Sequence, residues 1–193
     1  MDGFGRREFQ LVLLRRMADY QPDLVASAIG SLDASRTEMR QVNARWQRML
    51  RSSRFPGGER RLRLVLGQPV SSTERLLGDV TCRTAWWMLP LWPDLRFEAL
   101  IGPDGSVLQE WLIRPGTTAA PRLENVTDLV PWRYVVNDVA ERFAPVRHQA
   151  ETVPSRWHVA FSAPDGGRRR SYVAHFVWGL LQTVEELPGK DRR

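Results

Sequence analysis

The stretch that most constrains this chain runs from residue 80 to residue 114, because it holds four of the eight tryptophans and two strand-like runs around a tight turn. The runs 95–100 and 106–114 both alternate apolar and polar side chains. Between them lies Gly102-Pro103-Asp104-Gly105. Proline fixes φ, aspartate bonds locally and glycine supplies a positive φ, so the sequence predicts a β-hairpin.

A second hairpin is predicted near the C-terminus by the same chemistry. The runs 157–162 and 171–178 alternate around Pro164-Asp165-Gly166-Gly167, with Arg168-Arg169-Arg170 directly after the turn. We therefore expect an α+β protein. Its antiparallel sheet would be built from the two Pro-Asp-Gly hairpins, with helices packed on one face and a helical segment in front.

The N-terminal part reads as helical. Helices are predicted over residues 6–18, 22–30 and from Asp33 or Ser35 to about 52, and Phe55-Pro56-Gly57-Gly58 reads as a loop. Residues 62–66 fit either a short strand or the start of a helix. We expect a helical segment 1–54, followed by an α+β domain 60–185.

Two more helices are predicted inside the second part of the chain. Ser71 and Glu74 have the spacing of a capping box, so a brief helix is expected to begin there. Pro131 is expected to open another, with an apolar stripe that runs to Phe143.

The third helix leaves two functions open. Met39, Val42, Trp46 and Met49 form a narrow apolar seam with arginines outside it, which is typical of packing within the protein. A basic third helix could also lie in a DNA groove as part of a helix-turn-helix. Trp46 resembles a core residue, so we expect no binding to duplex DNA.

Composition excludes several classes of protein. The formal charge is +6, and Lys190 is the only lysine, so arginine supplies nearly all of the positive charge. No apolar run reaches eighteen residues and the N-terminus lacks the layout of a signal peptide, so we expect a cytoplasmic protein with no membrane partner. With a single cysteine and three scattered histidines, we expect neither a disulfide nor a metal site. The sequence contains no nucleotide-binding motif, so we expect no cofactor.

The tryptophans carry the main functional hypothesis. Trp86 and Trp87 are adjacent, so in a strand they face opposite sides of the sheet, and one side needs a cover, a cavity or a partner. A pocket with aromatic walls and an arginine at its mouth would suit a hydrophobic carboxylate. The alternative is an ordinary sheet with cross-strand ion pairs on its outer face. The candidate ligand-binding residues are Arg83, Trp87, Arg96, Phe97, Trp111 and Arg114, and the candidate catalytic residues are Glu98, Glu110 and His175.

Histidine and cysteine leave further alternatives. His158 and His175 lie on opposed strands of the second hairpin and could face each other, either as a catalytic pair or as ordinary sheet residues. Arg83 could depress the pKa of the Cys82 thiol, although a buried and inert cysteine is the preferred interpretation.

The order of segments resembles that of chorismate lyase-like proteins. The run Ser71-Ser72-Thr73-Glu74-Arg75-Leu76-Leu77 is similar to their helix start, and a strand, the turn Asp104-Gly105 and a second strand up to Pro115 follow. The resemblance covers roughly residues 60 to 180. It implies their fold, which also serves as the effector-binding half of some bacterial transcription regulators, and a ligand cavity. In those lyases an arginine and a glutamate hold the product. The corresponding positions of this chain are occupied by Phe97 and Ala174, so the resemblance does not imply pyruvate elimination.

These observations define two hypotheses of different classes. The first is a small-molecule-binding protein or biosynthetic enzyme for an aromatic or hydrophobic acid. The second is a non-catalytic module that binds protein or nucleic acid through its basic helical N-terminus. A homodimer is compatible with either.

Overall fold

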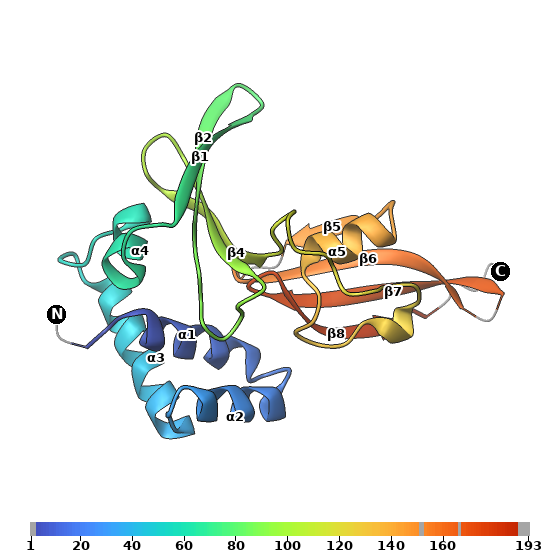
Figure 1. Ribbon diagram of the computed structural model, residues 1–193, viewed down its shortest axis with the longest axis horizontal. Coiled ribbons are helices and arrows are strands. Elements are labelled where there is room, and N and C mark those ends of the chain that lie inside the picture. The colour runs from blue at the N-terminus through green and yellow to red at the C-terminus, as the bar shows by residue number, and fades with distance from the viewer. Residues whose placement is uncertain (1–2, 151–152, 166, 189–193) are drawn as a thin grey trace. The chain divides into compact units, whose positions relative to one another are not determined.

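A computed structural model describes residues 3–150, 153–165 and 167–188 (Figure 1). The protein is α+β and contains two four-stranded antiparallel sheets. The chain forms two compact units, residues 1–110 and 111–193. Within the described residues, no helix is both long enough and apolar enough to cross a membrane.

In the first unit, the helices precede the strands in the sequence. The apolar seam of the third helix is confirmed, because Met39 and Trp46 are buried there. The Trp46 ring stacks on Phe4 at 5.2 Å and meets the edge of Phe9 at 5.7 Å. The helices are α1 (Arg6–Met17), α2 (Pro22–Ser31), α3 (Arg36–Arg51) and α4 (Gly58–Leu66), so residues 62–66 are helical.

The strands of the first sheet follow one another in the order β1-β2-β3-β4. The predicted turn at Pro103 joins β3 to β4, as expected, and the Asp104 carboxylate accepts a hydrogen bond from the Ser106 amide at 3.0 Å. The strands are β1 (Ser71–Leu77), β2 (Val80–Trp87), β3 (Arg96–Ile101) and β4 (Val107–Ile113).

The brief helix predicted at Ser71 is wrong, since this segment is strand β1. Every residue of β1 pairs with β2, from Ser71 opposite Trp86 to Leu77 opposite Val80. Gly78, with φ of 58°, allows the tight turn between the two strands. The continuous strand pairing with β2 stabilises this segment more than a helix capping box between Ser71 and Glu74 would.

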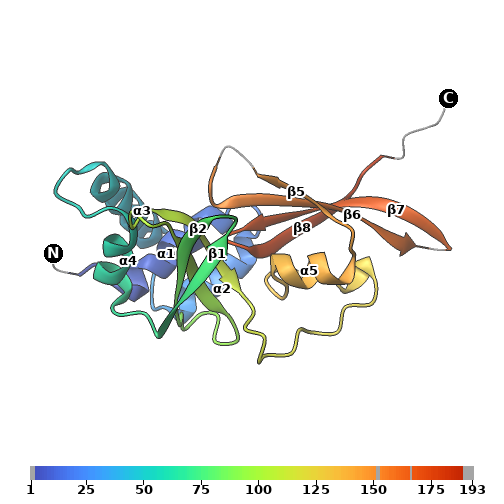
Figure 2. The same ribbon diagram turned by 90° about the horizontal axis from the view of Figure 1, so that it is seen from above.

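The second unit packs one helix and a loop on its sheet. Figure 2 shows α5 along one face of the four strands. Val159, Phe161, Tyr172, Ala174 and Phe176 face this side and form the core with Val139 and Phe143 from the helical region. The elements are the 3₁₀ turn η1 (Val126–Asp128), α5 (Val136–Arg142), β5 (Arg147–Ala150), β6 (Arg156–Asp165), β7 (Arg168–Val177) and β8 (Leu180–Glu186).

The second predicted hairpin is confirmed, because β6 and β7 pair from Arg156 opposite Val177 to Asp165 opposite Arg168. Gly166 of its predicted turn lies outside the described residues. The helix expected from Pro131 begins later, at Val136. Trp132 adopts a positive φ of 63°, and the Val135 amide donates to the Asp138 carboxylate at 3.0 Å, which sets the helix start.

The single sheet predicted from the two hairpins is wrong. The first hairpin lies in the sheet β1-β2-β3-β4 and the second in the sheet β5-β6-β7-β8. Alternation identifies a hairpin, but it does not say which other strands that hairpin joins. Each sheet completes its four strands from neighbouring segments of the chain.

Candidate functional site

The predicted aromatic walls of the pocket are core residues. Trp87 and Phe97 are fully buried and lie opposite each other in β2 and β3. The Phe97 ring meets Phe9 of α1 edge-on at 5.1 Å, and the Trp87 indole donates to the Gly67 carbonyl at 2.9 Å. The prediction that they line a ligand cavity is not supported by this packing, because α1 and the chain around Gly67 occupy the space beside their rings.

Trp86 shares the opposite face of the sheet with two predicted residues. The Arg96 guanidinium lies 4.0 Å from the centre of the Trp86 ring, and Glu98 pairs directly with Trp86 across the strands. Burial raises the pKa of Glu98, while Arg75 and Arg96 act in the opposite direction. This part of the predicted constellation assembles, as a stacked arginine beside a partly desolvated carboxyl group.

Arg83 lies on the side of the sheet that faces the helices, and it forms an ion pair with a residue of α4. Its guanidinium donates to both carboxylate oxygens of Glu59, and Arg63 binds the same carboxylate at 2.7 Å. The hydrogen bond from Arg83 lowers the pKa of Glu59 most strongly. This arginine therefore fixes α4 on the sheet.

Glu110 and Arg114 are likewise held in ion pairs. Arg61 of α4 donates to Glu110, whose pKa is raised by burial against the lowering effect of this partner. Arg114 binds Asp138 at 3.1 Å, and both side chains are largely buried. Glu110 lies in β4 and Arg114 directly follows it, and each is bound to a helix of its own unit.

The remaining candidates lie in the second unit. The Trp111 ring is 5.7 Å from that of Trp157. His158 and His175 face each other as expected, with ring centres 4.2 Å apart, and His175 lies 3.7 Å from the Glu185 carboxylate. The predicted site residues are thus divided between two compact units.

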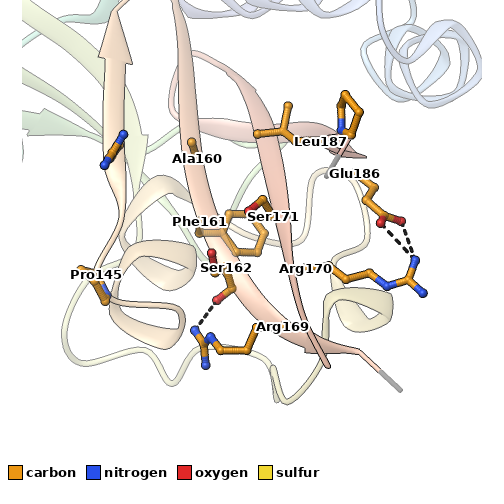
Figure 3. Close-up of a pocket in the computed structure, with 11 residues that line it drawn as sticks. Pro145, Ala160, Phe161, Ser162, Arg169, Arg170, Ser171, Glu186 and Leu187 are labelled. Carbon is orange, nitrogen blue, oxygen red and sulfur yellow. Dashed lines mark hydrogen bonds and ion pairs between the residues drawn. The ribbon is translucent and has the colours of Figure 1, made fainter. Parts of the chain in front are cut away.

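A cavity of the second unit lies away from these residues, on the face of the sheet turned away from its core. It measures about 670 Å³ and lies over β6 and β7 near their hairpin end (Figure 3). Its floor is made of the small side chains of Ala160, Ser162 and Ser171, and the two serines are direct cross-strand partners. Small side chains on a pleated surface leave a hollow between the larger ones around them.

Two arginines stand at the rim of this hollow. Arg147 of β5 lies opposite Ala160, and Arg169 of β7 lies one row beyond Ser171. Arg169 donates to the Ser162 carbonyl at 2.8 Å, as Figure 3 shows. No carboxylate among the described residues lies within ion-pair distance of either guanidinium.

A carboxylate, that of Glu186, also lines this hollow, together with Arg170, which binds it. Glu186 accepts two hydrogen bonds from Arg170, at 3.0 and 3.1 Å, and Arg170 also pairs with Asp165. The apolar walls are Pro145, Leu187 and Pro188. The hollow therefore combines two hydroxyl groups, an apolar border and two arginines that have no carboxylate partner among the described residues.

The sequence analysis missed Arg147 and Arg169 as site residues. The sequence feature that could have indicated them is the alternation of β6. His158, Ala160 and Ser162 face outward there, and the side chains of Ala160 and Ser162 are very small. A row of small residues beside an arginine cluster predicts a shallow polar hollow, whereas the tryptophans drew attention to a strand that is mostly core.

No group of three His, Cys, Asp or Glu side chains that could hold a metal ion occurs within residues 3–150, 153–165 and 167–188. Cys82 is buried and carries no disulfide. The hollow offers arginine and serine donors, which bind anions rather than metal ions.

The protein is α+β with two antiparallel sheets, and two arginines border the hollow on β6 and β7. No protein-family model matches the chain, and no curated protein matches it. A solved structure, described as that of a putative beta-lactamase inhibitor protein from Streptococcus mutans, is similar at a TM-score of 0.29 and 13% identity. The match covers 70% of this chain and 86% of that chain.

The predicted resemblance to chorismate lyase-like proteins is wrong. The run Ser71–Leu77 that carried it is a strand rather than a helix start, and the two hairpins belong to different sheets. The short motifs matched because turn and strand residues recur in unrelated folds.

Proposed function

We propose that the protein binds a small organic carboxylate with an aromatic or hydrophobic body, in the hollow on the outer face of β6 and β7. The observation that carries the proposal is the pair of rim arginines, Arg147 and Arg169, which have no carboxylate partner among the described residues. Guanidinium groups bind carboxylates through strong charge-assisted hydrogen bonds.

The remaining lining supports an organic rather than an inorganic anion. Pro145, Leu187 and Pro188 supply apolar contacts beside the arginines. A volume of about 670 Å³ lies within the usual range of small-molecule sites. Ser162 and Ser171 can donate to or accept from polar groups on the body of the ligand.

We propose that the protein binds the carboxylate without catalysing a reaction. The hollow presents arginine, serine and apolar side chains, and the Glu186 carboxylate that also lines it is bound by Arg170. Neither rim arginine is suited to proton transfer, because a guanidinium stays protonated at any ordinary pH. A role as sensor or carrier of a carboxylate fits these groups.

Thermal unfolding with a panel of carboxylates tests the proposal. Benzoate, 2-naphthoate and octanoate should raise the Tm in a concentration-dependent way, because a ligand that binds only the folded state stabilises it. Benzamide, which lacks the charge, should not. Arg147→Ala or Arg169→Ala should weaken binding about tenfold or more, as expected for the loss of one charged hydrogen-bonding partner.

The matched control is Arg168→Ala. Arg168 is an exposed arginine on the same hairpin, but it belongs to the alternate set of β7 residues and therefore points to the other face. This variant loses the same charge and should keep wild-type affinity. Equal losses in Arg168→Ala and Arg169→Ala would show a nonspecific charge effect and contradict the site.

A further inference from the structure

One side of helix α3 is lined by arginines. The exposed arginines of this helix are Arg36, Arg40, Arg48 and Arg51. At 3.6 residues per turn, their spacing places all four side chains within about a third of the helix circumference. The buried Trp46 lies outside this arc and contacts Phe9 of α1 (Figure 1). We call the surface of the four arginines the arginine face of α3.

No carboxylate neutralises the arginine face. None of its four guanidinium groups forms an ion pair with a carboxylate in the part of the chain that the structure describes. The one acidic residue of α3, Glu38, lies on another side of the helix and is bound by Arg7 at 2.7 Å. Like charges three or four residues apart destabilise a helix. The clustering therefore does not serve the stability of α3, and an anionic partner would relieve the repulsion.

The other side chains of the arginine face indicate which anion it suits. They are small or polar, namely Thr37, Ala44 and Gln47. Leu50 is exposed, but it lies four residues after Trp46 and so belongs to the side that packs in the core. A face without exposed apolar side chains does not insert into lipid, and one without aromatic side chains does not stack on unpaired bases. The arginine face therefore suits a regular array of phosphates.

We propose that the arginine face of α3 binds the phosphate backbone of duplex DNA, with the helix lying along the major groove. The 16 residues of α3 extend over about 24 Å. The major groove of B-form DNA admits an α-helix, whereas that of an RNA duplex is deep and narrow. Arg36 and Arg48 lie at the two borders of the arginine face, so they are placed to reach phosphates on the two sides of the groove.

This binding does not depend on sequence. Phosphate contacts carry no sequence information. The expectation that the chain does not bind duplex DNA rested on Trp46, which is buried and therefore reads no base. Backbone binding needs no such residue. The contacts lie in the first unit and are independent of the carboxylate site in the second.

Fluorescence anisotropy of a short labelled DNA duplex, titrated with the full chain, measures the binding. Two duplexes of unrelated sequence should bind equally well. The slope of log K against log salt should be about −3.6, because each of four neutralised phosphates contributes about −0.9. A chain that binds neither duplex at low salt would overturn the proposal.

Arg40→Gln combined with Arg48→Gln tests the arginine face itself. Glutamine has a helix propensity close to that of arginine, and both positions are exposed, so α3 should keep its fold. The double variant should bind at least about tenfold more weakly at low salt, and its salt slope should be shallower by about 2. The matched control is Arg133→Gln combined with Arg168→Gln, which removes two exposed arginines of the second unit. Equal losses in the two double variants would show a general charge effect and contradict the site.

Two other polyanions test whether duplex DNA is the partner. An RNA duplex and vesicles that contain phosphatidylserine carry negative charge in a different geometry. Each should bind more weakly than the DNA duplex at the same salt concentration. Equal or stronger binding of either one, lost in the double variant of Arg40 and Arg48, would overturn duplex DNA as the partner of this face.

Discussion

At the residue scale, the environment of each charged side chain decides what it does. Arg83 and Arg114 looked like ligand-binding residues in sequence, yet each is held by a carboxylate of its own unit. Arg169 lies in the arginine run directly after a predicted turn and was not a candidate site residue, yet it borders a hollow. Residue type and alternation are visible in the sequence, whereas the partner of a charge is set by which helix packs on which strand.

Two glutamates in the first unit should respond to pH in opposite directions. Burial raises the pKa of Glu98, so between its unfolded and folded pKa the folded state binds more protons, and stability falls as pH rises. The pKa of Glu59 is lowered, chiefly by Arg83, so it contributes stability above its unfolded pKa that is lost as pH falls through its folded pKa.

Urea unfolding of Glu98→Gln and Glu59→Gln over a pH series measures this. Relative to wild type, Glu98→Gln should gain stability on going from acid to neutral pH, because it removes a carboxylate that is penalised when ionised. Glu59→Gln should lose stability over the same interval. Slopes of the same sign for the two variants would contradict the assigned environments.

At the element scale, local chemistry predicted hairpins and helices well where caps and turns are strong. Ser35 caps α3 by accepting the Glu38 amide at 3.0 Å, and both Pro-Asp-Gly segments join adjacent strands. Strand β1 was missed because its serine and glutamate mimic a helix start, and its turn, Gly78-Asp79, was not recognised. The partition into two sheets depends on contacts between distant segments, which no local pattern contains.

The turn between β7 and β8 gives an element-scale prediction. Gly179 has φ of 76°, and a Cβ there would lie 2.7 Å from the Leu112 carbonyl oxygen and 2.8 Å from Trp111. Gly179→Ala therefore combines left-handed strain with a steric clash. Gly105→Ala is the matched control, because Gly105 has φ of 80° and open space around it.

Chemical denaturation should separate the two effects. Gly105→Ala is expected to cost about 1–2 kcal/mol from the backbone conformation alone. Gly179→Ala should cost at least about 1 kcal/mol more, as is typical of overpacking. Equal costs would show that β4 residues Trp111 and Leu112 do not lie against this turn.

At the scale of the whole molecule, the chain forms two compact units, residues 1–110 and 111–193, and each contains helices and antiparallel strands. In the first unit, strand β1 is an exposed edge of its sheet. In the second unit, the outer sheet face has a hollow bordered by two arginines.

Amide NMR of the labelled protein titrated with benzoate shows directly whether a carboxylate binds in the hollow on β6 and β7. We expect saturable shifts of the Ala160, Ser162 and Ser171 amides that disappear in Arg169→Ala and persist in Arg168→Ala. Shifts confined to residues around Trp86 and Arg96, or no saturable shift with any carboxylate of the panel, would contradict binding in this hollow.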